Sequence, residues 1–208
     1  AQKENMGQGK KRIDGLLKVT GAAQYATDFA ADGVACAQLL KSTAASGRIL
    51  EIDSSEAEKA AGVLAVITYK NAPKINPRNG IRGGGLLQDA AVEYYAQNIG
   101  TVVAETYEQA RYAARLISVK YELSDAKVDF EKHKSEAAKP TAQDRQDAVR
   151  GDADAAFQAA EYKVEAVYET PIEHHQPMAP HATIAVWDGA EKLVLYNESQ
   201  VVNGVQDA

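Results

Sequence analysis

The spacing of apolar and polar residues predicts a domain in which short strands alternate with short helices. The apolar run at 34–40 has the length of a strand, and the β-branched residues at 63–68 predict a second, buried strand. A third strand is expected at 99–104, and a fourth, with alternating apolar and polar residues, at 117–122. This alternation is typical of an α+β domain.

The two predicted helices lie between these strands. Asp53 is expected to cap the first helix, at 54–61, in a capping box with Glu56. Gly62 supplies the left-handed residue that ends this helix. The second helix is expected at 105–116, and its apolar stripe consists of Ala110, Ala113, Ala114 and Ile117. Each helix should therefore lie between two strands, on one face of a single sheet.

Two polar segments are predicted to lack regular structure. Residues 71–88 are rich in Pro, Gly and Asn, and their Gly83–Gly85 run lacks the strand and helix start that a phosphate-binding loop needs. Residues 124–149 read as a long connector with one helical turn, because they contain few apolar residues. A connector of this length indicates a domain boundary.

The sequence beyond the connector predicts a second, smaller set of elements. In order, they are a helix at 153–160, a strand at 162–169, hairpin strands at 183–187 and 193–196, and the opening of a helix at 201–208. Asp188–Gly189 is a hairpin turn signal. Because the last segment only begins a helix, we expect this second domain to be incomplete.

Composition narrows the possible functions. The chain has 208 residues, of which 45% are hydrophobic and 25% charged, and its formal net charge is −6. Without a dense basic cluster, a nucleic-acid partner is not expected. No apolar run approaches the roughly 20 residues of a membrane helix. The single cysteine, Cys36, is expected to be a small buried side chain in an apolar run.

Three of the four histidines, His174, His175 and His181, lie close together in the sequence. Imidazole is a common metal ligand, but their spacing does not match a helix-face metal motif. Pro177 and Pro180 favour an extended path that points the rings in different directions. We expect these histidines to have structural or supporting roles, and no metal ligand is predicted.

The remaining motifs predict no catalytic residue. The RGD triplet at 150–152 has the form of an adhesion motif, but Asp152 is better explained as the cap of the following helix. Glu165 and Glu169 have strand spacing on an expected solvent face. No group of nucleophile, base and orienting residue is recognisable.

Four stretches of sequence follow one another in a distinctive order. They are RIDGLLKVTGAAQYATDF, KSTAASGRILEID with AAGVLAVIT, IGTVVAETYEQARYAARLISVKYE, and RGDADAAF with the later MAPHA and WDG. Together, over 12–200, they resemble the large, molybdenum-binding subunit of the xanthine dehydrogenase and aldehyde oxidase family. STAASGRI and TYKNAP are similar to its bacterial aldehyde oxidoreductase branch.

The resemblance implies an α/β-hammerhead domain at residues 12–125, followed at 148–208 by the beginning of the first molybdopterin-binding domain. It implies oxidation of aldehydes or N-heterocycles with water as the oxygen source. The cofactor would be molybdenum–molybdopterin, expected in its cytosine dinucleotide form, with [2Fe-2S] centres and FAD on partner subunits. The expected partners are the remainder of the molybdenum-binding subunit, an iron–sulfur subunit and an FAD subunit, in the cytoplasm or the periplasm.

The resemblance also implies one cofactor contact. In the family, a glutamine at the end of a strand lies beside the molybdenum's oxo ligand. The segment YNESQVV places Gln200 at that position, with Val201 beside it as a backbone contact. An amide NH₂ can donate to an oxo oxygen without adding charge. The alternative is that Gln200 only ends a strand.

The sequence departs from the family pattern in several places. The usual G-Q-P-V-A occurs as residues 96–100, AQNIG, and the usual M-E-P-H-A occurs as residues 178–182, MAPHA. Residues 42–48 lack the histidines of the usual S-P-H-A-H. The family's catalytic glutamate and pterin-binding glycine loops lie far downstream and have no counterpart, so the chain alone is not expected to turn over substrate.

A second, non-enzymatic hypothesis is an interaction or assembly module that has kept the hammerhead fold. Such a module would be a stable monomer with a covered surface around 201–205. The enzymatic hypothesis instead predicts apolar faces beyond residue 150 that the chain itself leaves uncovered.

Overall fold

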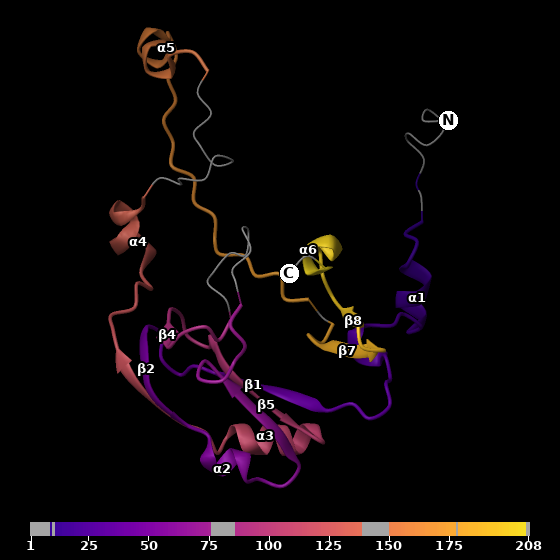
Figure 1. The fold of residues 1–208 in the computed structure, drawn as a ribbon. Helices are drawn as coiled ribbons and strands as arrows, with labels where there is room; N and C mark the ends of the chain where they lie inside the picture. The colour runs from indigo at the N-terminus through magenta and orange to yellow at the C-terminus, as the bar shows by residue number, and fades with distance from the viewer. Residues whose placement is uncertain (1–8, 10, 76–85, 139–149, 178, 207–208) are drawn as a thin grey trace. The chain divides into compact units, whose positions relative to one another are not determined.

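The computed structural model describes residues 9, 11–75, 86–138, 150–177 and 179–206. They divide into two compact units, Ala1–Asp125 with Pro177–Ala208, and Ala126–Gln176. Strands and helices mix in the first unit, as an α+β domain requires (Figure 1). The Gly83–Gly85 run, for which no phosphate site was predicted, lies outside the described residues.

The first sheet of this unit is built around β5 (Asn98–Ala104). Its order is β1 (Cys36–Lys41), β5 and β3 (Val63–Thr68), and β5 pairs antiparallel with both neighbours. Because side chains alternate along a strand, β5 contributes to both faces of the sheet. Val102 is buried among helix residues, whereas Ile99 is buried in a separate cluster with residues of the second sheet.

The second sheet has β2 (Gly47–Asp53) in its middle, between β4 (Ala91–Val92) and β6 (Ser118–Leu123). Both pairings are antiparallel. Glu51 lies opposite Lys120, and the two side chains form an exposed ion pair with an N–O distance of 2.6 Å. The hydrogen bond that Lys120 donates to Glu51 raises the pKa of Lys120 above its usual value.

The expectation of a single sheet is wrong. The strands predicted at 34–40, 63–68 and 99–104 form the first sheet as β1, β3 and β5, but the strand predicted at 117–122, β6, belongs to the second sheet with β2 and β4. Alternation along a strand determines which side chains are buried, but not which distant strand supplies the hydrogen bonds. The local pattern therefore predicted β1, β3, β5 and β6, but it missed β2 and β4 and with them the second sheet.

The helix α2 (Ser55–Glu58) is shorter than expected, and the predicted capping box of Asp53 with Glu56 is wrong. Asp53 is the last residue of β2, so Ser54 takes the cap position, without a side-chain hydrogen bond to the helix amides. Asp53 Oδ1 instead accepts the Ser55 N–H at 3.0 Å, which lowers the pKa of Asp53. Pairing of β2 with β6 therefore moved the helix start by one residue.

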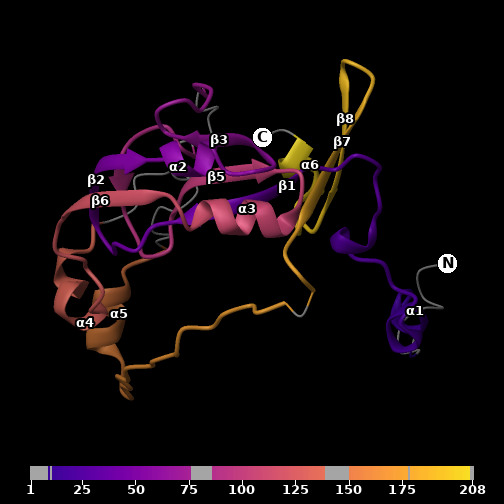
Figure 2. The same ribbon diagram turned by 90° about the horizontal axis from the view of Figure 1, so that it is seen from below.

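The helix α3 (Tyr107–Ala114) covers the first sheet along β1 and β5 (Figure 2). It begins with a capping box that the sequence analysis missed. Thr106 Oγ1 accepts the Gln109 N–H at 3.3 Å, and Gln109 Oε1 accepts the Thr106 N–H at 3.0 Å. The predicted apolar stripe is confirmed in part, because Ala110 and Ala113 are fully buried and Ala114 is half-buried, whereas Ile117 lies beyond the end of the helix.

Two apolar clusters hold the two sheets and the helices α2 and α3 together. The cluster that joins the two sheets consists of Ala44, Ile49, Ile52, Val92 and Ile99. The cluster under the helices consists of Ala57, Val66, Val102 and Ala113. Ile117 packs against both clusters, so the segment between α3 and β6 connects them. Cys36 is only half-buried, against expectation, because it begins β1 at the edge of the first sheet.

The other elements of the first unit lie before and after the two sheets. They are the helix α1 (Gly15–Thr20), the 3-10 turn η2 (Ala26–Asp28), the strands β7 (Thr183–Asp188) and β8 (Lys192–Asn197), and the helix α6 (Val202–Gln206). The predicted hairpin and the predicted final helix are therefore confirmed. Neither α1 nor η2 was predicted.

The second unit contains α4 (Phe130–His133), the 3-10 turn η3 (Lys134–Glu136) and α5 (Ala153–Ala159). The cap of α5 is confirmed, because Asp152 Oδ1 accepts the Ala155 N–H at 2.9 Å. The helices of the described residues include none with the length and apolar character that spanning a membrane requires.

The strand predicted at 162–169 does not form, and this prediction is wrong. The segment is extended but unpaired, and its larger apolar side chains are 84–87% exposed. A strand needs a neighbour to bond its amides and carbonyls, and the described residues of this unit provide no neighbouring strand. Alternating sequence alone therefore could not produce a strand here.

Gly62 has the predicted left-handed conformation but does not end the first helix, because α2 ends at Glu58 and Gly62 lies in the turn before β3. Its φ is 77°, and its carbonyl accepts the Glu105 N–H at 2.8 Å. A Cβ at this position would lie 2.2 Å from Gln109 Nε2. Gln109 cannot move aside freely, because its side chain also bonds the Thr106 amide at the start of α3.

Gly62→Ala is therefore expected to lower the free energy of unfolding by more than the cost of the left-handed backbone conformation alone. The conformation costs about 1–2 kcal/mol and the disturbed cap about 1 kcal/mol more. Gly33→Ala is the matched control, because Gly33 has φ 67° and nothing within 4 Å of the added Cβ. Urea unfolding followed by far-ultraviolet circular dichroism measures both, and equal losses would show that Gln109 imposes no constraint.

Ala96 occupies the position at which the resembling family has glycine, and it keeps the turn that glycine would favour. Its φ is 64°, and its N–H donates to the Ser42 carbonyl at 3.0 Å. Ser42 is 2% exposed, and its own N–H donates to the Gln97 carbonyl at 2.8 Å. Ala96 therefore adopts a left-handed conformation that is unfavourable for alanine, because the surrounding hydrogen bonds hold its backbone there.

Ala96→Gly is expected to raise the free energy of unfolding by about 1 kcal/mol, because it removes the Cβ clash of the left-handed conformation. Ala37→Gly, in the extended backbone of β1, should lower it by about 0.5–1 kcal/mol. The same denaturation measurement distinguishes them. Destabilisation by both changes would contradict a strained Ala96.

Candidate functional site

The hairpin β7–β8 carries the segment that precedes Gln200. Its register is regular, from Thr183 opposite Asn197 to Asp188 opposite Lys192. At the turn, Lys192 Nζ lies 2.6 Å from Asp188 Oδ2, and Gly189 has φ 75°. At the open end, Thr183 Oγ1 donates to Asn197 Oδ1 at 2.9 Å. The predicted turn is confirmed, and side-chain bonds fix both ends of the hairpin.

The two faces of the hairpin differ in how well they are covered. The half-buried face consists of Ile184, Val186, Val194 and Tyr196. On this face the Phe29 ring stacks on Tyr196, with centroids 4.3 Å apart and ring planes at 22°. On the opposite face, Trp187, Leu193 and Leu195 are 65%, 43% and 43% exposed. A two-stranded ribbon with an open apolar face is marginally stable in water.

The turn η2 brings Phe29 to the hairpin. Asp28 Oδ2 accepts the Tyr25 N–H at 2.8 Å, which closes the turn, and Ala26 is only 4% exposed. η2 contacts β7 directly. The sequence analysis missed this contact, although the carboxylate three residues after Tyr25 was a signal for a capped turn.

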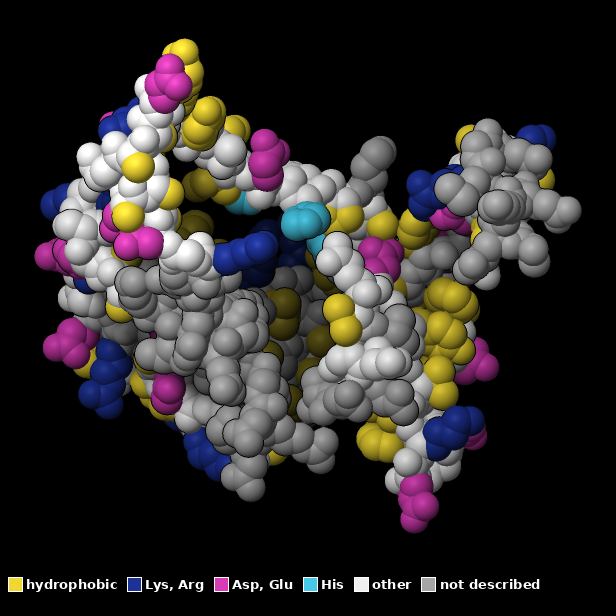
Figure 3. All heavy atoms as spheres, turned by 90° about the horizontal axis from the view of Figure 1, so that it is seen from above, with side chains coloured by type: hydrophobic (Ala, Val, Ile, Leu, Met, Phe, Trp, Pro, Cys, Tyr) yellow, Lys and Arg dark blue, Asp and Glu magenta, His cyan; other side chains and the backbone are white. Residues whose placement is uncertain are grey.

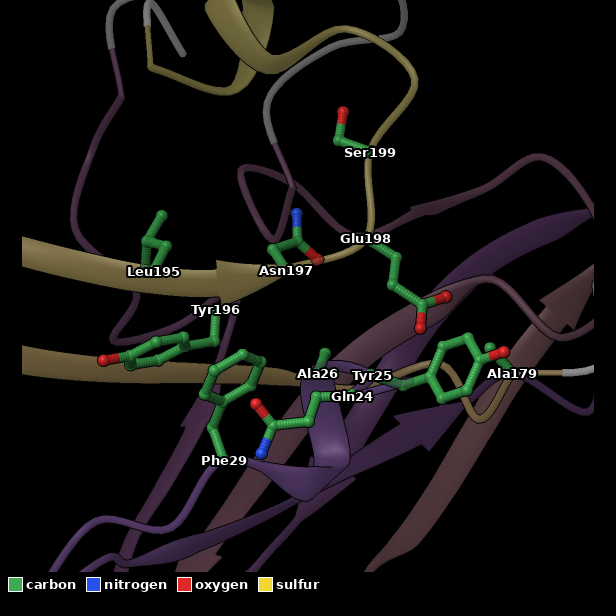
Figure 4. Close-up of a pocket in the computed structure, with 10 residues that line it drawn as sticks. All are labelled: Gln24, Tyr25, Ala26, Phe29, Ala179, Leu195, Tyr196, Asn197, Glu198 and Ser199. Atoms are coloured by element: carbon green, nitrogen blue, oxygen red, sulfur yellow. The ribbon is translucent and has the colours of Figure 1, made fainter. Parts of the chain in front are cut away.

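An open recess of about 540 Å³ lies between η2 and the end of β8 (Figure 4). Its lining residues are Gln24, Tyr25, Ala26, Phe29, Ala179, Leu195, Tyr196, Asn197, Glu198 and Ser199. The described residues that line it include no lysine or arginine, and Glu198 adds a carboxylate. Repulsion from this carboxylate makes the recess a poor fit for the phosphate of a pterin cofactor.

The structure places Gln200 and Val201 directly after this recess, between β8 and α6. Both are exposed. The Val201 N–H donates to Ser199 Oγ at 3.1 Å, and the Val201 carbonyl accepts the Val205 N–H at 3.2 Å. The Gln200 amide therefore fits a neutral hydrogen-bonding contact, whereas the Val201 backbone groups already have partners within the chain.

The three neighbouring histidines belong to different units, His174 and His175 to the second and His181 to the first. His174, His175 and His181 are all exposed, and the space-filling view shows histidine rings at the surface (Figure 3). Within the described ranges there is no group of three or more His, Cys, Asp or Glu residues that could hold a metal ion. Glu165 and Glu169 are exposed in the unpaired segment.

The strongest charge interactions lie elsewhere and are local. Hydrogen bonds from Arg12 and Lys18 hold the pKa of Asp14 well below its usual range at the start of α1. Lys127 and then His133 lower the pKa of Glu136 in the second unit. These side chains are exposed or half-buried and satisfy one another, so they indicate local stabilisation rather than catalysis.

Comparison with known families assigns most of the chain. The family described as aldehyde oxidase and xanthine dehydrogenase, a/b hammerhead domain, matches residues 20–125. The family described as molybdopterin cofactor-binding domain matches residues 130–208. The two matches occur in the order that the sequence resemblance implied.

Individual relatives agree with this assignment. The aldehyde oxidoreductase molybdenum-binding subunit of Escherichia coli K12 is 40% identical over 95% of this chain. A probable xanthine dehydrogenase subunit from Bacillus subtilis is 32% identical over 91% of it. The chain spans 27% of the length of the first relative and 26% of the second.

Two solved enzyme structures share the fold over most of the chain. Quinoline 2-oxidoreductase from Pseudomonas putida 86 matches 64% of this chain and 18% of its own, with 25% identity and a TM-score of 0.53. CO dehydrogenase from Oligotropha carboxidovorans matches 61% of this chain and 16% of its own, with 30% identity and a TM-score of 0.51. With its hammerhead domain followed by molybdopterin-binding sequence, the chain belongs to the aldehyde oxidase and xanthine dehydrogenase family.

Proposed function

We propose that the chain is the N-terminal part of the molybdenum-binding subunit of an enzyme that oxidises aldehydes or N-heterocycles with water as the oxygen source. The observation that carries this proposal is the 40% identity to an aldehyde oxidoreductase subunit, sustained along 95% of the chain. We assign the hammerhead domain to 12–125 and the beginning of the molybdopterin-binding domain to 148–208.

The cofactor of the family is molybdenum–molybdopterin, and we propose its cytosine dinucleotide form. When bound, it supplies the oxygen-transfer chemistry and accepts the substrate's electrons. We propose that these electrons continue to [2Fe-2S] centres and FAD on partner subunits. The match of residues 130–208 to a molybdopterin-binding domain supports the assignment of molybdenum–molybdopterin.

Gln200 is the residue that we propose as this chain's contact to the cofactor. Its NH₂ would donate a hydrogen bond to an oxygen ligand of the metal and add no charge there. Its exposure, three residues after the last residue of β8, supports this role. A Val201 backbone contact requires that Ser199 Oγ first release the Val201 N–H.

The uncovered apolar surface favours this function over a free-standing assembly module. Such a module should cover its surface around Val201, but this side chain is 64% exposed. Trp187, Leu193 and Leu195 also form an open apolar face on the hairpin. Surface of this kind is typical of a site that further polypeptide covers.

The purified 208-residue chain is expected to contain no stoichiometric molybdenum, because it presents a single candidate contact and a recess that does not suit phosphate. Co-expression with the remaining subunit polypeptide and the iron–sulfur and FAD subunits should give about one molybdenum per complex. Inductively coupled plasma mass spectrometry measures both. Stoichiometric molybdenum on the isolated chain would refute a shared site.

In the molybdenum-loaded complex, Gln200→Ala should lower kcat/KM roughly 10- to 100-fold, because it removes a donor aimed at the reacting centre. Gln200→Glu should lose at least as much, since its carboxylate would repel an oxo ligand. Gln158→Ala, at an exposed glutamine of α5, is the control. Rates are normalised to molybdenum content, and a loss below twofold for Gln200→Ala would reject the assignment.

A further inference from the structure

The stack of Phe29 on Tyr196 joins two segments that lie far apart in the sequence. Figure 4 shows the two rings together on one side of the recess. Phe29 directly follows η2, a turn closed by Asp28 and anchored by the buried Ala26. The ring therefore projects from a locally fixed backbone rather than from a free arm.

Tyr196 lies where its contact with Phe29 can restrict the movement of the end of β8. It is the next-to-last residue of the strand and lies opposite Ile184 in the register. Asn197 is the last paired residue, and the chain then leaves the hairpin toward Gln200. The face of the hairpin opposite the stack is open, so the hairpin has few other packing contacts that could hold it.

We propose that Phe29 is a positioning residue: by stacking on Tyr196 it holds the end of β8, and thereby the amide of Gln200, in place. Phe29 touches neither the cofactor nor the substrate in this arrangement. The last step rests on the proposed role of Gln200, whereas the hold on β8 stands on the stack itself.

The contact depends on a flat ring and not only on apolar volume. Ring planes at 22° and centroids at 4.3 Å give an offset stack, in which aromatic pairs are more stable than their buried area alone accounts for. Leucine would fill part of the space but could not stack. Tyrosine would keep the ring, so Phe29→Leu and Phe29→Tyr separate stacking from simple burial.

Hydrogen exchange of the 208-residue chain, followed by mass spectrometry, tests the hold on β8. In Phe29→Leu, amides of 183–201 should exchange roughly two- to tenfold faster than in the unmodified chain. Phe29→Tyr should restore the slower rates. Phe130→Leu is the matched control, because Phe130 is 75% exposed in α4 and should leave this segment unchanged.

Unchanged exchange in Phe29→Leu would overturn the proposal. Fast exchange of the β7 and β8 amides in the unmodified chain would also overturn it, because the stack would then not stabilise the hairpin.

The molybdenum-loaded complex tests the link to Gln200. Phe29→Leu should lower kcat several-fold and shift the Mo(V) electron paramagnetic resonance signal in the same direction as Gln200→Ala, with Phe29→Tyr close to the unmodified enzyme. Faster exchange with unchanged kinetics and spectrum, beside an impaired Gln200→Ala, would overturn the positioning role. Unchanged kinetics in Gln200→Ala would instead reject the glutamine's role, and the exchange rates alone would then decide whether Phe29 holds β8.

Discussion

Burial of β5 on both of its faces is the constraint on which the hammerhead lobe depends. Val102 is fully buried on the side of the helices, and Ile99 is buried where the two sheets meet. β1 and β3 bond its two edges. Residues 36–123 therefore contain sheets and helices that cover one another, and the lobe needs no further polypeptide to bury these clusters.

In contrast, the residues that follow this lobe leave apolar side chains uncovered. The hairpin covers one apolar face through Phe29 and leaves the other open, and the apolar side chains of 162–169 lie in solvent without a paired strand. Exposed apolar surface that the chain itself does not bury indicates a missing neighbour. Gln200 follows the hairpin that carries the open apolar face, which agrees with the proposal of a cofactor site shared between this chain and further polypeptide.

The sequence predicted the local elements well, because their signals are themselves local. Apolar runs marked β1, β3 and β5, a turn dipeptide marked the hairpin, and Asp152 marked the start of α5. Predictions failed where distant segments decide the outcome. Pairing of β2 with β6 kept Asp53 in a strand, and the absence of a neighbouring strand in the described part of its unit left 162–169 unpaired.

The candidate site was predictable only in part, for a related reason. Gln200 could be proposed because the resemblance to a known family extends through YNESQVV. The Phe29–Tyr196 stack could not, since no local pattern indicates that a ring after an N-terminal turn will meet the end of a distant strand. The resemblance to the family pointed to Gln200, whereas the structure revealed the stack on the strand that precedes it.

The central claim is that Gln200, in the segment that follows β8, provides a neutral donor to the metal's oxygen ligand. An experimental structure of the assembled, molybdenum-loaded subunit tests it most directly, through the distance from Gln200 Nε2 to that oxygen. The account predicts a hydrogen-bond distance of about 2.7–3.2 Å. A Gln200 side chain directed into solvent, with the ligand contacted by other residues, would contradict it.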